Sequence, residues 1–156
     1  MRVSENTVDE LDEFFEERLD EITELINDAR DRLGDAFGEE VARVSADEVR
    51  EEFDDFLADE DAALNAAALY RLGVELEVRN DYAGFIVDEI VGRNLASVVA
   101  GDEPERTLAE ATFHYIDVHA DEVLDGTTAG EDDVLAGLAA GVQTRLPGWD
   151  WQEDGF

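Results

Sequence analysis

Apolar residues recur every three or four positions through residues 5–33, a spacing typical of an amphipathic helix. These positions are Val8, Leu11, Phe15, Leu19, Ile22, Leu25, Ile26, Ala29 and Leu33. Most residues between them are Asp or Glu, and Arg18 stands where a strict heptad places an apolar residue. The spacing predicts one long helix that packs in a bundle, because the repeat ends after four heptads. Coiled-coil pairing with a second chain stays open as the alternative.

A second amphipathic helix is expected to begin at residue 45. Gly34 and Gly38 mark a break before it, where residues 39–44 have room for one short turn. Ser45 and Glu48 have the spacing of a capping box, in which each side chain bonds to the other residue's backbone N–H. The helix should run to about Ala58, and its acidic outer face disfavours nucleic-acid binding.

Residues 62–101 form the most apolar stretch of the chain and are expected to form its core. Five alanines between residues 62 and 68 give one helix a smooth surface that a neighbouring helix can approach closely. Residues 82–100 are apolar over most of a helical circumference. The expected apolar stripe of the alanine-rich helix comprises Leu64, Leu69, Leu72 and Leu76. Residues 74–78 alternate as a strand would, but a lone short strand has no partner, so a buried central helical hairpin is predicted.

Two further helices are predicted before the end of the chain, over residues 102–124 and 131–146. Gly137 and Gly141 lie one turn apart on the second of them, a spacing that favours close helix packing. Pro147 and Gly148 end this helix. The sequence therefore predicts an all-α, single-domain bundle of five or six helices over residues 1–146, followed by an aromatic and acidic tail over residues 147–156.

The charge of the chain is extreme. It contains 43 acidic residues, 11 arginines and no lysine, which gives a formal net charge of −32. Such charge destabilises a compact state by self-repulsion unless salt screens it, and the Debye length is only about 3 Å at 1 M salt. We expect a cytosolic protein of a salt-accumulating archaeon. The alternative is a purpose-built acidic protein, such as a nucleic-acid mimic.

Absent residues exclude several chemistries. Without cysteine there are no disulfides, thiolate metal sites or cysteine nucleophiles. Without lysine there is no Walker-type phosphate loop and no Schiff base. The first residues have no apolar signal-peptide region, and no segment approaches 18 uninterrupted apolar residues. We therefore expect a cytoplasmic protein that binds neither membrane nor nucleic acid and needs no cofactor.

One helix face carries potential metal ligands. At 100° per residue, four side chains of the helix predicted over residues 102–124 fall within about 60° of one another. These candidate ligands are Glu110, His114, Asp117 and Asp121. His119 points to the opposite side, where a buried core histidine is expected. A solvated row with a charged His114 is the simpler interpretation of the face.

Two groups of carboxylates suggest a different metal chemistry. The first comprises Glu48, Glu51, Glu52 and Asp55, and the second comprises Asp88 and Glu89. This arrangement loosely resembles the all-α nucleotide pyrophosphohydrolases similar to MazG, in which acids on two helices hold a metal and a triphosphate. The resemblance implies a Mg²⁺-dependent phosphohydrolase, which is the alternative function.

The favoured function is a non-catalytic helical interaction or regulatory protein. Its partner is another protein or a second copy of the chain, contacted through the long first helix or the tail. The candidate partner-binding residues of the tail are Trp149, Trp151 and Phe156. Tryptophan is enriched at binding hot spots, although the rings would also serve to seal one end of the bundle.

Overall fold

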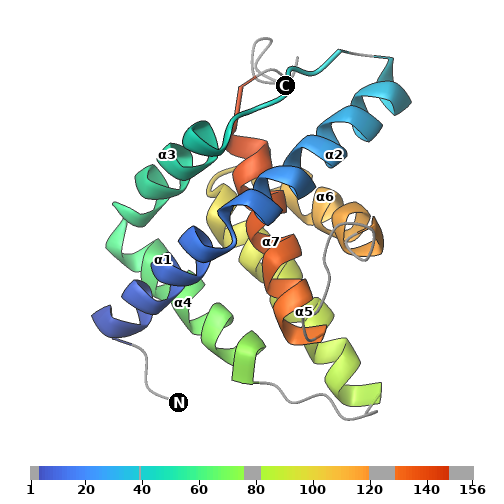
Figure 1. The fold of residues 1–156 in the computed structure, drawn as a ribbon. Coiled ribbons are helices and arrows are strands. Elements are labelled where there is room, and N and C mark those ends of the chain that lie inside the picture. Colours follow the sequence, from blue (N-terminus) through green and yellow to red (C-terminus); the bar gives the residue numbers. More distant parts are fainter. Residues whose placement is uncertain (1–3, 39, 76–81, 120–128, 148–156) are drawn as a thin grey trace.

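Helices account for almost all of the regular structure. The computed structural model describes residues 4–38, 40–75, 82–119 and 129–147. In these ranges it contains seven helices and no strand, which confirms the all-α, single-domain prediction (Figure 1). The helices are α1 (Glu5–Glu17), α2 (Leu19–Phe37), α3 (Ala46–Leu57), α4 (Glu60–Glu75), α5 (Tyr82–Ala100), α6 (Glu105–His119) and α7 (Ala129–Arg145).

The predicted long helix is divided, so five or six helices was too low a number. Arg18, with φ −107° and ψ 12°, separates α1 from α2, and the two helices follow one line in Figure 1. The break falls where the apolar spacing slips by one residue. Phe15 and Ile22, on the two sides of the break, are both fully buried. α2 continues beyond the predicted end to Phe37 and stops at Gly38, whose φ of 72° suits glycine.

The helix boundaries elsewhere differ from expectation by a few residues. Residues 40–45 form no helical turn, and α3 begins after Ser45 with the predicted capping box. α6 begins at Glu105 and α7 at Ala129, whereas α5 has the predicted bounds. The uncertain segment 74–78 is helical at residues 74 and 75, and its remainder lies outside the described residues, as do residues 120–124.

α7 occupies the centre of the bundle. Every residue from Val134 to Thr144 is buried, and α7 packs against α5 and α6 and also against α2, α3 and α4. Figure 1 shows it running alongside α5 through the middle of the molecule. The central pair is therefore α5 with α7, which corrects the predicted α4–α5 hairpin.

Glycines let these central helices approach closely. A Cβ added to Gly137 would lie 2.5 Å from the carbonyl oxygen of Gly92, and one added to Gly141 would lie 2.6 Å from the Cβ of Val99. Gly92 in turn faces the ring of Phe113 on α6, 2.5 Å from such a Cβ. The predicted close packing at residues 137 and 141 is confirmed, and it explains why α7 lies deeper than α4.

α4 is oriented differently from the prediction. Its buried side is made of small residues: Ala63, Ala66, Ala67 and Gly73. Leu64 and Leu72 retain 36% and 37% of their exposure instead of forming an inward stripe, and Leu69 is half-buried against the core. Small residues face inward because they let the axis of α4 come close to the neighbouring helices α1 and α5.

A buried arginine ties three distant segments together. Arg30 of α2 is fully buried, and its Nε donates to the carbonyl of Ala42 at 2.9 Å. Its other nitrogens donate to Gln143 Oε1 at 3.4 Å and to the carbonyl of Pro147. Burial lowers the pKa of Arg30, and the nearby Glu48 carboxylate offsets part of that effect. This side chain fixes residues 40–45 and the end of α7 to α2.

A second arginine joins α1 to α3. Arg50 pairs with Asp12 and Glu16 of α1 and with Asp54 of its own helix. Its guanidinium lies 5.3 Å from the ring centroid of Phe15, which stacks on Phe53 at 3.8 Å. Burial alone lowers the pKa of Arg50, but the hydrogen bonds to Asp54 and Asp12 and the negative charges of these two residues together outweigh burial and raise it.

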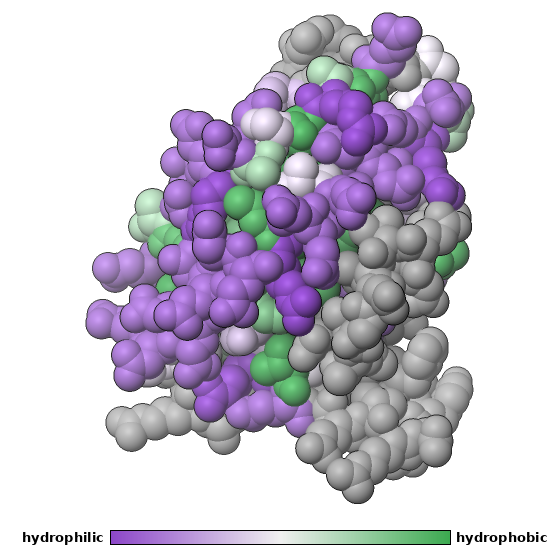
Figure 2. All heavy atoms as spheres, viewed as in Figure 1, coloured by the Kyte–Doolittle hydropathy of each residue, from purple (hydrophilic) through white to green (hydrophobic). Residues whose placement is uncertain are grey.

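One face of the molecule is strongly hydrophilic (Figure 2). The face shown in Figure 2 is covered by polar side chains, with small apolar patches between them. Within the described ranges, no helix is long and apolar enough to cross a membrane.

Candidate functional site

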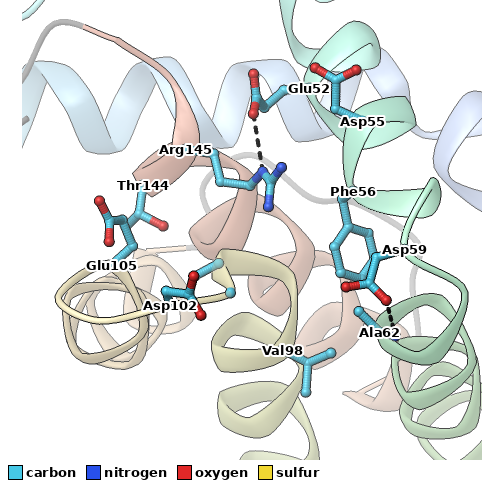
Figure 3. A pocket seen from close by; sticks show the side chains of 12 residues that line it. Glu52, Asp55, Phe56, Asp59, Ala62, Val98, Asp102, Glu105, Thr144 and Arg145 are labelled. Carbon is cyan, nitrogen blue, oxygen red and sulfur yellow. Dashed lines mark hydrogen bonds and ion pairs between the residues drawn. The ribbon is translucent and has the colours of Figure 1, made fainter.

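An acidic hollow of about 480 Å³ opens where five helices meet. α3 and the start of α4 form one side, and the end of α5, the start of α6 and the end of α7 form the other (Figure 3). The apolar part of the wall consists of Phe56, Ala62 and Val98. The carboxylates that line the hollow are Glu52, Asp55, Asp59, Asp102 and Glu105.

Arg145 is the only cation among the described residues that line the hollow. Its Nε donates to Glu52 Oε1 at 3.1 Å, and its Nη1 donates to the carbonyl of Val99 at 3.2 Å. Asp59 accepts the backbone N–H of Ala62 at 3.2 Å, near the start of α4. Arg145 therefore neutralises one carboxylate, and the hollow keeps an excess of negative charge.

The carboxylates are spread around the hollow instead of converging on one point. In Figure 3 they stand on separate walls, with Glu52 and Asp55 on α3 and Asp102 and Glu105 on the opposite side. Across the described part of the chain, no group of three His, Asp or Glu side chains could hold a metal ion.

The carboxylates proposed for Mg²⁺ are only partly brought together. Glu52 and Asp55 line the hollow, but Glu48 belongs to the helix cap, where its backbone N–H donates to Ser45 Oγ at 3.2 Å. Glu51 is exposed and does not line the hollow. Asp88 and Glu89 lie outside the side chains that the structure describes, so the two-helix clamp stays a prediction.

Sequence reasoning missed four residues of the hollow: Asp59, Asp102, Glu105 and Arg145. The three acids have the ordinary appearance of residues at helix starts, where the helix dipole favours negative charge. Nothing in their spacing shows that the starts of α4 and α6 meet at one place. That relationship comes from the packing of both helices around α5 and α7.

The other sequence candidates fall on two regions. On α6, His114 is exposed while Glu110 and Asp117 are half-buried. Asp121 lies outside the described residues, as does the side chain of His119, so the four-ligand prediction is not tested. The tail residues Trp149, Trp151 and Phe156 also lie outside the described residues, and their role stays a prediction.

A second concave surface, which we call the α4 groove, lies between α1, the end of α3 and the start of α4. It has a volume of about 290 Å³. The groove is lined by Glu5, Val8, Asp9, Leu57, Glu60, Ala63 and Leu64. Leu64, Ala68 and Leu72 follow one another at intervals of four residues, so an apolar row runs from the groove along α4. We call these three residues the leucine row.

Comparison with known proteins places the whole chain in one family. A family described as a domain of unknown function (DUF7984) matches residues 1–155, and the chain belongs to it. No curated protein and no solved structure matches the chain.

Proposed function

We propose that this protein is a non-catalytic helical interaction protein of a salt-adapted archaeal cytosol, and that α4 is its contact element. The observation that carries the proposal is the orientation of α4. This helix buries alanine and glycine, while Leu64 and Leu72 stand partly exposed on the leucine row.

The energetics of leucine burial support an interface at this helix. Complete burial of a leucine side chain contributes about 1.5–3 kcal/mol. The fold gains only part of that from Leu64 and Leu72, each more than a third exposed. A partner helix laid along the row would gain the remainder. Single exposed leucines are ordinary, whereas a row that continues into a groove is typical of a helix-binding surface.

The expected salt environment favours the same surface. In multimolar salt the Debye length falls below about 3 Å, so charges on a convex surface attract a partner weakly. Apolar contacts do not depend on charge. A protein with a net charge of −32 that works under these conditions therefore needs apolar contact surfaces to bind a partner stably.

Affinity capture from a native high-salt lysate tests the proposal. The wild-type chain should recover a partner that a Leu64→Gln/Leu72→Gln variant loses. The matched control is Val118→Gln on α6, because Val118 is 62% exposed and lies on another helix. Equal recovery by the leucine variant would exclude α4 as the contact element. The same capture without residues 149–156 assigns or removes a role for Trp149, Trp151 and Phe156.

The alternative proposal is a Mg²⁺-dependent phosphohydrolase of the kind that MazG represents. Its support is that Glu52 and Asp55 share one hollow with three further carboxylates. Calorimetric titration of Mg²⁺, Mn²⁺ and nucleoside triphosphates in multimolar KCl tests it. Saturable binding that disappears in Asp55→Asn would favour the enzyme, and the absence of heat for every ligand would exclude it.

A further inference from the structure

We infer that the α4 groove and the leucine row bind an amphipathic helix that carries arginines beside its apolar face. This inference rests on the proposed function and adds the chemistry of the partner. Three observations carry it: the apolar floor of the groove, the charge of its rim and the length of the row.

The floor of the groove is apolar. Val8 and Leu57 are half-buried, Ala63 is 2% exposed, and Leu64 extends from the groove to the surface. These side chains come from three different helices that pack together, so the floor is held by the fold itself. An aliphatic side chain of a partner helix would cover them.

The described residues at the rim of the groove are acidic. Glu5 and Asp9 on α1 and Glu60 on α4 are exposed, and none of the described residues that line the groove is cationic. Arg71, farther along α4, is bound by Glu10 and Glu75, each at 2.6 Å. The acidic rim and the carboxylates around Arg71 therefore leave negative charge beside the row, which is complementary to a cationic partner.

The leucine row has the length of a short helical contact. At 1.5 Å per residue, Leu64 and Leu72 are separated by about 12 Å along the helix axis. That distance spans about two turns of a partner helix, as in other complexes in which a helix lies in a groove. Arginine suits the rim better than lysine, because its planar guanidinium binds carboxylates in a bidentate manner and is more weakly hydrated.

The charge of the groove rim argues against a second copy as the occupant. Contact through the row would place the acidic rim of one copy beside that of the other, and like charges at contact distance disfavour the pairing. A partner with basic flanks removes this cost.

Two synthetic helical peptides provide the test. They share one Leu/Ala face and differ only in their flanks, which are arginine in one peptide and glutamate in the other. Fluorescence anisotropy measures their binding to the full chain, in KCl at which circular dichroism shows the protein folded. We expect the arginine peptide to bind about tenfold more tightly, the result of a few contact ion pairs.

Two variants separate the inference from the proposed function. Leu64→Gln/Leu72→Gln should abolish binding of both peptides. Glu5→Gln/Asp9→Asn/Glu60→Gln should keep the binding and reduce the preference for arginine to less than about threefold. Circular dichroism of each variant controls for loss of helix.

Each outcome bears on the arginine inference, on the proposed interaction function or on both. Equal binding of both peptides that depends on the leucines would overturn the arginine inference and leave the interaction function in place. Binding that survives the leucine substitutions would overturn both statements, and so would failure of both peptides to bind. Leucine-dependent dimerisation in sedimentation experiments would identify a second copy as the occupant and overturn the arginine inference alone.

Discussion

Gly137 of α7 faces the carbonyl oxygen of Gly92 on α5 so closely that no side chain fits between them. A Cβ added at Gly137 would lie 2.5 Å from that oxygen and 3.3 Å from the Cβ of Leu95. The obstacle is partly backbone, which cannot rotate away as a side chain can. The two central helices of the bundle are therefore held at a separation that only glycine permits.

Gly137→Ala should lower the free energy of unfolding by about 1–3 kcal/mol, the usual cost of overpacking a core. Gly141→Ala should have a similar effect, because its Cβ would meet Val99. Urea unfolding at fixed KCl measures both. Asn94→Ala on the exposed side of α5 is the control and should change stability by less than about 0.5 kcal/mol. If Gly137→Ala unfolded at the same urea concentration as the wild type, that result would contradict the close helix contact.

Arg30→Met should destabilise the protein by about 2–4 kcal/mol, because it leaves the carbonyls of Ala42 and Pro147 without their donor. Arg30→Lys should recover only part of the loss, since a single ammonium cannot reproduce the guanidinium fork. Thermal unfolding followed by circular dichroism measures both variants. Full stability of Arg30→Lys would show that charge alone matters at this position.

The pairing of Arg50 with Asp12 should contribute measurably to the joint between α1 and α3. In a double-mutant cycle with Arg50→Met and Asp12→Asn, we expect a coupling energy of about 0.5–1.5 kcal/mol. The matched control is Arg43→Met with Asp31→Asn, an exposed pair that should couple by less than about 0.5 kcal/mol. Equal coupling in the two cycles would mean that burial of Arg50 adds nothing.

Stability should rise steeply with KCl. Screening of the 43 carboxylates should raise the melting midpoint by about 10 °C or more between dilute buffer and 2 M KCl. A variant with several exposed acids replaced by their amides should reach the same midpoint at lower salt, because its self-repulsion is smaller. A midpoint that does not change with KCl would refute the salt-adapted origin.

The apolar periodicity predicted the helices well, because it is a local property of the chain. The capping box at Ser45 followed from the spacing of Ser45 and Glu48, and the bounds of α5 followed from its continuous apolar stretch. The orientation of α4 could not be predicted in this way, because leucine is more apolar than alanine. Only packing against neighbouring helices favours the smaller side chain on the inward face. The glycines at 137 and 141 indicated close packing but did not name Gly92 and Val99 as the partners.

The acidic hollow was harder to predict than the fold. Glu52 and Asp55 were singled out from their density on one helix. Asp59 and Asp102 each resemble an ordinary helix start, and their proximity depends on how distant helices cross. The density of acidic residues along the sequence therefore identified part of the α3 wall of the hollow. It could not identify the opposite wall.

The central position of α7 also bears on the order in which the chain acquires its structure during synthesis. α7 is the last of the seven helices to leave the ribosome, yet it packs against five of the earlier ones. Until it emerges, the nascent chain exposes the apolar surface that α7 will cover, and such surface promotes aggregation. The many carboxylates of the nascent chain favour its solubility during this interval. The acidic residues that we expect to make the finished protein dependent on salt would therefore also help to keep it in solution while it is being made.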